Sequence, residues 1–179
     1  TLETVPAAAE LNSRATIGSA IMETIRVFVA IDLPSSVVDE IARVQNLLKP
    51  LGLDAAWVKP YNVHLTLKFL GNVTLRQADE VKGLLGKAID GFPKFFVTLS
   101  GLGAFPDFKR PRVLWIGLDD SSNLLEPLQK KIEASLAEVG FSPEPGKFSP
   151  HLTLARLKSP RGKERLKAEI EKIGGVQSD

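Results

Sequence analysis

Two nearly identical tetrapeptides, His64-Leu65-Thr66-Leu67 and His151-Leu152-Thr153-Leu154, stand far apart in a sequence of 179 residues. The chain has only two histidines, and each of them opens one tetrapeptide. The likeness continues with more differences to Leu70 in the first copy and to Leu157 in the second. This agreement indicates an internal duplication, so we expect the two copies to occupy equivalent positions in the fold.

Each tetrapeptide fits a β-strand with one polar and one apolar face, because alternate residues of a strand point to opposite sides. In the first copy His64 and Thr66 share the polar face, whereas both leucines and Phe69 lie on the other. The second copy repeats this pattern with His151 and Thr153. Each strand would then hold an imidazole and a hydroxyl about 6.6 Å apart along the chain, and the two polar faces could line one cleft.

The composition is that of a soluble globular protein, with 44% hydrophobic and 25% charged residues and therefore no bias towards disorder. A net charge of +2 does not indicate a nucleic-acid-binding arm or a membrane-binding patch. The sequence has no cysteine, which excludes disulfides, thiolate nucleophiles and cysteine-ligated metals. No apolar run reaches the roughly 18 residues of a membrane helix, and we expect a cytoplasmic protein.

The rest of the pattern predicts two halves, each with the order strand, helix, histidine strand, helix, and one additional strand between them. Hydrophobic periodicity and turn residues place the elements of the first half at 26–31, 37–48, 64–71 and 74–89. The additional strand is expected at 95–102. The elements of the second half are expected at 112–118, 120–139, 151–157 and 161–173.

This order favours an α+β fold: a bilobal single domain in which duplicated strand–helix–strand–helix halves pack about a pseudo-two-fold axis around a central cleft. The domain is expected to span 22–179, because Met22 directly precedes a convincing strand. Residues 1–21 are rich in Ala, Thr and Ser with little apolar periodicity, and we interpret them as a leader or an expression-derived segment. A short native surface helix over 7–21 is the alternative.

Two imidazoles across a cleft suit paired general acid–base catalysis. An unperturbed imidazole titrates at about pH 6.5, so a neutral ring that accepts a proton and a charged ring that donates one can coexist. The threonine hydroxyls can donate hydrogen bonds to oxygens of the group under attack. A phosphodiester fits these groups, because it has an attacking oxygen, a leaving oxygen and two non-bridging oxygens. A purely structural role for both histidines is the alternative.

Other kinds of site fit less well. A zinc site needs at least three protein ligands, and no Asp or Glu lies within several residues of either histidine. The sequence has no Gly-rich phosphate loop of the Walker type and no signature of a serine or cysteine triad. We therefore expect neither a metal nor a cofactor.

The stretches around both histidines resemble the paired motifs of the two-histidine (2H) phosphoesterase superfamily, and within it the LigT-like RNA 2′,3′-cyclic phosphodiesterases. These stretches are His64-Leu-Thr-Leu-Lys-Phe-Leu-Gly71 and Pro150-His-Leu-Thr-Leu-Ala-Arg156. The resemblance also covers 26–34 and 57–60, and so nearly everything from Met22 onward. It implies a bilobal α+β fold with the motifs facing each other, and metal-independent opening of 2′,3′-cyclic phosphates on RNA ends or nucleotides to 2′-phosphates. Some members also join RNA ends through a 2′-5′ linkage.

The same resemblance implies roles for single residues. His64 and His151 would be the catalytic pair, and Thr66 and Thr153 would contact the phosphate. We assign His151 as the base that activates water and His64 as the acid that protonates the departing O3′, although near-symmetric halves leave the opposite split open. Arg156 matches an arginine thought to help at the site of LigT-like members. Simple alternation, however, puts Arg156 on the face away from His151, unless a bulge or a curling side chain brings it round.

Several other residues have open roles. Arg156 could instead form a structural salt bridge, and Lys68, in phase with the first motif, could face phosphate or be a solvated charge at the strand end. A basic connector could hold an RNA backbone and stack a base, or be a solvated loop beside packed aromatic rings. Its residues are Lys109, Arg110, Arg112, Phe105 and Phe108. Core packing and base stacking are both open for Trp57, Tyr61 and Phe148.

We therefore predict an RNA 2′,3′-cyclic phosphodiesterase that acts without metal or cofactor. Its partners would be RNA ends or nucleotides that carry a 2′,3′-cyclic phosphate, and it would act as a monomer away from membranes. Two alternatives stay open: a non-catalytic protein that binds RNA ends or nucleotides, and a 2′-5′ RNA ligase with incidental hydrolysis.

Overall fold

The computed structural model describes residues 24–159 and 161–173. These residues form the predicted α+β fold, with two antiparallel sheets. The strands are β1 (Thr24–Ile31), β2 (Ala55–Trp57), β3 (Leu65–Thr74), β4 (Thr98–Phe105), β5 (Val113–Asp119) and β6 (His151–Leu157). The α-helices are α1 (Ser35–Leu48), α2 (Leu75–Ile89), α3 (Leu125–Ala137) and α4 (Lys163–Ile173), and the 3-10 turns are η1 (Lys49–Leu51) and η2 (Pro60–Asn62).

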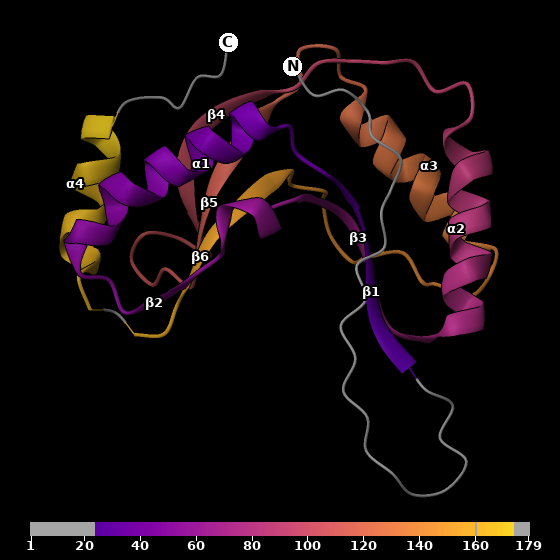
Figure 1. Ribbon diagram of the computed structural model, residues 1–179, viewed down its shortest axis with the longest axis horizontal. Helices are drawn as coiled ribbons and strands as arrows, with labels where there is room; N and C mark the ends of the chain where they lie inside the picture. Colours follow the sequence, from indigo (N-terminus) through magenta and orange to yellow (C-terminus); the bar gives the residue numbers. More distant parts are fainter. Residues whose placement is uncertain (1–23, 160, 174–179) are drawn as a thin grey trace, which may run out of the picture.

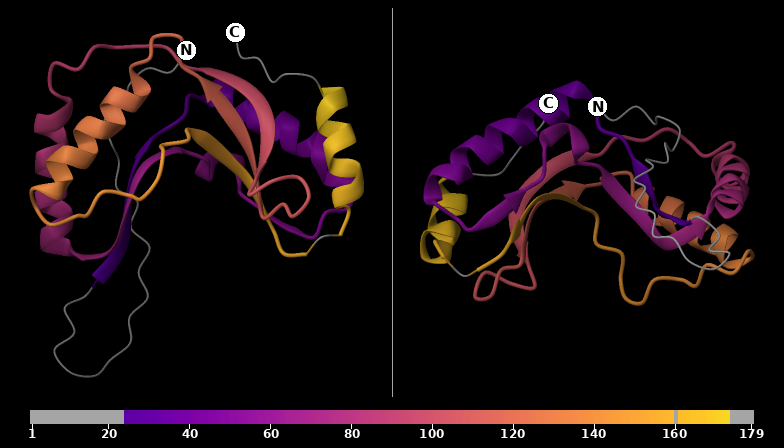
Figure 2. Two further views of the ribbon diagram at one scale, coloured as in Figure 1. Left: turned by 180° about the vertical axis from the view of Figure 1, so that it is seen from behind. Right: turned by 60° about the horizontal axis from the view of Figure 1, so that its bottom comes forward.

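The elements form two lobes that meet in an arch (Figure 1). One lobe holds the two-stranded sheet β1-β3 with α2 and α3, and the other holds the four-stranded sheet β2-β6-β5-β4 with α1 and α4. Figure 2 shows the same division from behind. The bilobal prediction is thus confirmed, and the halves also exchange helices. Helix α1 of the first half packs on the sheet of the second half, whereas α3 of the second half packs against β3.

The larger of two clusters of buried hydrophobic residues runs through both lobes and makes them one domain. Leu65 and Leu67 of β3 join Leu152 and Leu154 of β6 in this core. The apolar stripe predicted for α1 is buried in the same core, with Val37, Ile41, Val44 and Leu48. The predicted leader at 1–21 lies outside the described residues.

Helix α2 begins where the sequence predicts. Thr74 closes a capping box, because its hydroxyl accepts a hydrogen bond from the Gln77 N–H while the Gln77 side chain accepts one from the Thr74 N–H. Strand β4, by contrast, begins at Thr98 rather than at 95, because Phe95 lies in the core on irregular backbone before the sheet.

Among 24–159 and 161–173, no helix is long and apolar enough to cross a membrane.

Helix α3 begins five residues later than predicted, at Leu125 rather than at Asp120. Residues 120–123 form a turn instead, in which Asn123 has a φ of 55° and donates a hydrogen bond from its N–H to the Asp120 carbonyl. The Asp120 carboxylate accepts a hydrogen bond from the Leu125 N–H at 2.6 Å. Asp120 therefore still stabilises the start of the helix, across the turn.

Candidate active site

All five residues predicted for the site line one pocket of about 1070 Å³. His64 and Thr66 reach this pocket from the start of β3, and His151, Thr153 and Arg156 reach it from β6. Strands β3 and β6 contact each other where the lobes meet. The fold thus brings together two imidazoles, each with a threonine two residues later, that are far apart in the sequence.

A β-bulge in β6 puts Arg156 on the same side as His151. In the ladder with β5, Leu154 has no partner, although Thr153 and Ala155 on either side of it do. An extra residue of this kind resets the alternation of a strand. Leu154 and Ala155 are therefore both buried, and Arg156 lines the pocket. Simple alternation is wrong for Arg156, and the bulge is the reason.

The same bulge occurs in β3. Leu67 has no partner on β1, although Thr66 and Lys68 on either side of it do. Lys68 is therefore buried and Phe69 lines the pocket, which reverses the faces that simple alternation predicts for both. Phe69 in β3 and Arg156 in β6 thus occupy equivalent positions in the two halves, directly beyond each bulge.

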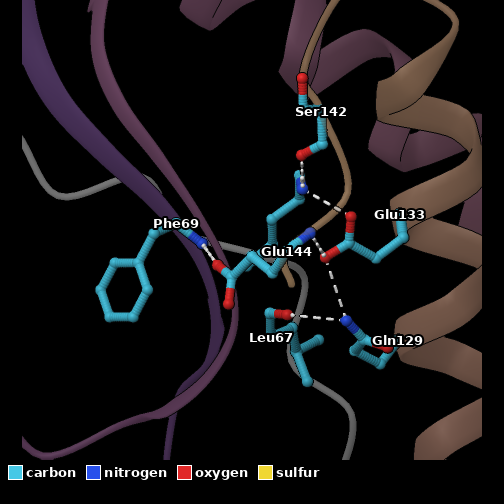
Figure 3. Close-up of polar contacts among 7 residues, drawn as sticks. Leu67, Phe69, Gln129, Glu133, Ser142 and Glu144 are labelled. Carbon is cyan, nitrogen blue, oxygen red and sulfur yellow. Dashed lines mark hydrogen bonds and ion pairs between the residues drawn. The ribbon is translucent and has the colours of Figure 1, made fainter. Parts of the chain in front are cut away.

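Lys68 neither faces the pocket nor lies in solvent, so both interpretations of this residue are wrong. Its side chain is 1% exposed. Its Nζ donates hydrogen bonds to Glu133 Oε2 at 2.5 Å and to the Ser142 carbonyl at 2.8 Å, within the cluster drawn in Figure 3. Lys68 therefore ties β3 to α3 by a buried ion pair and contributes no charge to the pocket.

Each imidazole packs against a phenylalanine. The ring of Phe28 stacks on His64 with the centroids 4.5 Å apart and the planes at 16°, whereas Phe105 meets His151 edge-on at 4.9 Å and 87°. His151 Nδ1 lies 2.7 Å from the Ser149 carbonyl. A carbonyl only accepts hydrogen bonds, so Nδ1 carries the proton and the lone pair of the neutral ring is on Nε2. That nitrogen can accept a proton from a nucleophile.

The pocket carries positive charge. The guanidinium groups of Arg26 and Arg156 line it. Within the described part of the chain, neither of them has a carboxylate at ion-pair distance. Arginine without an internal partner is well suited to bind phosphate oxygens. With the residues at 24–159 and 161–173, Arg156 therefore forms no structural salt bridge, which was the alternative for it.

A second hollow, of about 550 Å³, adjoins the pocket. The two share Phe105 and Val113, and the second hollow is completed by Pro106, Arg110 and Arg112 of the predicted basic connector. The connector folds as a turn in which the Asp107 carboxylate accepts hydrogen bonds from the N–H groups of Arg110 and Lys109, and these bonds lower the pKa of that carboxyl. A basic, partly aromatic surface thus extends from His151 to the connector.

The aromatic residues whose roles the sequence leaves open lie in different parts of the structure. Phe105 lines the pocket, whereas Tyr61 is 68% exposed with the Lys59 ammonium 5.7 Å from its ring centroid. Phe108, Trp57 and Phe148 pack against the core. Phe28 and Phe69 line the pocket and were missed. Phe28 lies in an uninterrupted apolar run, where periodicity cannot distinguish a face.

Metal ligands do not gather in the described parts of the chain. Across 24–159 and 161–173, no three side chains of His, Cys, Asp or Glu lie close enough together to hold a metal ion. Among the described residues that line the pocket, none is Asp or Glu. Their pocket offers two imidazoles, two hydroxyls and two guanidiniums, a set that fits a phosphate ester better than a cation.

The family described as LigT like Phosphoesterase matches the sequence twice, at residues 31–115 and 116–179. Each match contains one histidine motif, in agreement with the duplication. Several relatives are named RNA 2′,3′-cyclic phosphodiesterase. The one from Aquifex aeolicus is 41% identical over 140 residues, which cover 77% of this chain and 73% of that protein. The one from Methanothermobacter thermautotrophicus is 32% identical over 154 residues, which cover 86% and 81%.

Solved structures share the fold. E. coli LigT complexed with 3′-AMP superposes with a TM-score of 0.63 at 30% identity, over 75% of this chain and 74% of that one. A Thermus thermophilus protein superposes with a TM-score of 0.64 at 28% identity, over 75% of both chains. Other LigT crystals contain ATP or phosphate. The proteins similar to this chain thus include several that were crystallised with phosphate-containing molecules.

Proposed function

The chain belongs to the LigT-like phosphoesterase family, and on that premise we propose that it hydrolyses 2′,3′-cyclic phosphates on RNA ends or nucleotides to 2′-phosphates. The observation that carries this proposal is the single pocket lined by both histidines and both threonines. The names of the relatives, RNA 2′,3′-cyclic phosphodiesterase, support the same reaction.

His151 acts as the base and His64 as the acid. Water attacks phosphorus while Nε2 of His151 takes its proton, and the phosphorus–O3′ bond breaks while the His64 imidazolium gives its proton to O3′. The products are a 3′-hydroxyl and a 2′-phosphate, and the two rings have exchanged protonation states. The hydrogen bond between His151 Nδ1 and the Ser149 carbonyl supports this assignment, because it leaves Nε2 to act as the base.

Thr66, Thr153 and Arg156 bind the phosphate. The two hydroxyls donate hydrogen bonds to the two non-bridging oxygens, one from each half of the pocket. The Arg156 guanidinium stabilises the charge that develops on these oxygens during attack. This arrangement needs neither a metal nor a cofactor, because proton transfer and charge stabilisation both come from side chains.

The substrate extends from the pocket over the basic connector. Arg110 and Arg112 are at the right place to meet the phosphates of the nucleotides that precede the cyclic end, and Phe105 offers a ring to a base.

A location in the cytoplasm and a monomeric state stay predictions. Size-exclusion chromatography with light scattering checks the second of these.

Product analysis on a short RNA that ends in a 2′,3′-cyclic phosphate tests the proposal. We expect turnover in the presence of EDTA, with an RNA 2′-phosphate as the product by ³¹P NMR. A 3′-phosphate product would reverse the leaving group that we assign. Tight binding without turnover would favour the non-catalytic alternative, and a dominant 2′-5′ junction after addition of an RNA with a 5′-hydroxyl would favour the ligase.

A further inference from the structure

Four polar or charged side chains are buried in the part of the chain that the structure describes: Gln45, Lys68, Gln129 and Glu133. Lys68 and Glu133 are the ion pair between β3 and α3. Burial of a polar group costs free energy unless it is fully hydrogen-bonded, so the bonds of these side chains indicate what they are for. Gln45 and Gln129 bond to the unpaired residues of the two bulges, and the ion pair adjoins the bulge of β3.

Gln45 bonds to the bulge of β6. It lies on α1 with 1% of its surface exposed, and its Nε2 donates hydrogen bonds to the Val58 carbonyl at 2.7 Å and to the Leu154 carbonyl at 3.1 Å. The Leu154 carbonyl also accepts a hydrogen bond from the Val58 N–H at 2.9 Å. The amide therefore holds the unpaired residue of the bulge, two positions before Arg156.

Gln129 bonds to the bulge of β3. It lies on α3, and its Nε2 donates to the Leu67 carbonyl at 3.4 Å and to Glu133 Oε1 at 3.1 Å (Figure 3). Beyond this bulge the Phe69 N–H donates to the Glu144 carboxylate at 2.6 Å. The second bulge is thus held by the same kind of side chain as the first, with an ion pair added.

The two glutamines are themselves part of the duplication. Val44-Gln45 is followed three residues later by Leu48, and Leu128-Gln129 is followed three residues later by Ile132, all four apolar residues being buried. Because the halves exchange helices, each glutamine reaches the histidine strand of the other half. The halves therefore hold each other's bulges.

We propose that Gln45 and Gln129 are positioning residues of the active site, each of which fixes the bulge that turns the next pocket residue towards the phosphate. Gln45 acts through Arg156 and Gln129 acts through Phe69. An apolar side chain of similar volume would fill the same space, but it could not bond the carbonyl at the bulge. This role rests on the proposed function, because it gives Arg156 a phosphate to bind.

The test is a double-mutant cycle with Gln45→Met and Arg156→Ala, assayed on a 2′,3′-cyclic nucleotide well below the melting temperature. Loss of the bond should let the bulge relax and displace Arg156, and we expect kcat/KM to fall about tenfold or more in the wild-type background. In the Arg156→Ala background, the same substitution should cost less than about twofold, since the residue on which it acts is gone. Val44→Ala serves as the control, because it changes a neighbouring core residue that has no side-chain hydrogen bond to β6. It should lower kcat/KM by less than about twofold in both the wild-type and the Arg156→Ala background.

The outcomes are distinguishable. Equal losses from Gln45→Met in both backgrounds, or no loss in either, would overturn the positioning role. An active wild type that is unaffected by Arg156→Ala would overturn it as well, whereas an inactive wild type would count against the proposed function itself. If Gln45→Met does not fold by circular dichroism, Gln45→Ala replaces it in the cycle. Failure of both to fold would make Gln45 a residue of the fold only and contradict the proposal.

Discussion

The phenyl ring of Phe28 stacks on the imidazole of His64, with the centroids 4.5 Å apart and the planes at 16°. Phe28 comes from β1 and His64 from the residue before β3, so the ring that faces the pocket is supported by the neighbouring strand. Phe105 supports His151 in a different way, edge-on at 87°. The two histidines are therefore equivalent by sequence but not by environment, as expected if they perform different steps.

We expect Phe28→Leu to lower kcat about two- to tenfold with little change in KM. Aromatic pairs contribute about 0.5–1.5 kcal/mol beyond their burial, and without the stacked ring the His64 imidazole can rotate away from the leaving oxygen. Steady-state kinetics on a 2′,3′-cyclic nucleotide provide the measurement. Phe96→Leu, at a ring that is 64% exposed and does not line the pocket, is the matched control. An unchanged kcat in Phe28→Leu would show that the stacking does not orient the acid.

The connector should distinguish RNA from a mononucleotide. Replacement of Arg110 and Arg112 by Ala is expected to raise KM for an RNA oligonucleotide about tenfold and to leave kcat/KM for a cyclic mononucleotide within about twofold. Each lost phosphate contact should also lower the slope of log KM against log salt by about 0.7. Arg76→Ala, at an exposed arginine of α2, controls for the loss of one positive charge away from the connector. Equal effects on both substrates would contradict the prediction that the connector binds RNA.

Breaking the buried ion pair between Lys68 and Glu133 should destabilise the fold strongly, whereas replacing both partners by apolar residues should have little effect on stability. Lys68→Met leaves the Glu133 carboxylate without its cation, and we expect the free energy of unfolding to fall by about 3 kcal/mol. Adding Glu133→Leu should restore most of this loss. Urea unfolding provides the measurement, with Arg76→Ala at the exposed Arg76–Glu80 pair as a control expected to cost below about 1 kcal/mol. If Lys68→Met lowered the free energy of unfolding no more than the control does, the result would contradict the buried pairing.

Asp120 should make the stability of the fold depend on pH. Partial burial raises the pKa of this carboxyl, but hydrogen bonds from the Ser122 hydroxyl and the N–H groups of Leu125 and Ser122 outweigh it, so the pKa is lowered in the folded protein. A lowered pKa stabilises the fold above the ordinary value, and the contribution is lost as the pH falls through the lowered one.

Asp120→Asn tests this dependence. The substitution should cost about 0.5–1 kcal/mol near neutral pH, as for an anion at a helix N-terminus, and the difference from the wild type should shrink below about pH 4. Thermal unfolding across pH 2.5–7.5 is a suitable measurement. A change of about 1 kcal/mol in the free energy of unfolding shifts the melting temperature by a few degrees, which can be resolved. A difference that stays constant with pH would contradict the charge-dependent bond.

Much of the site was predictable because its signal is local. The two His-x-Thr copies, the helix after Thr74 and the core stripe of α1 all follow from spacing within a few residues. Their meeting in one pocket follows from the duplication, since equivalent strands of a two-fold arrangement occupy equivalent places. The family resemblance pointed to Arg156 before the strand geometry could account for it.

The bulges could not be predicted from alternation. One unpaired residue, Leu67 or Leu154, reverses the faces of the residues directly beyond it, and it leaves no mark in a sequence of mixed polar and apolar residues. For this reason Lys68 and Phe69 were placed on the wrong sides of β3. The exchange of α1 and α3 was also hidden, because an amphipathic stripe shows that a helix is buried but not which sheet it covers.

The central claim is that two remote imidazoles perform one reaction, and the most direct measurement is kcat/KM on a 2′,3′-cyclic nucleotide in EDTA for the wild type, His64→Ala and His151→Ala. The wild type should release the 2′-phosphate, and each variant should lose a factor of about 10²–10⁴ while it keeps the far-UV circular dichroism spectrum of the fold. Full activity in either variant would contradict paired catalysis.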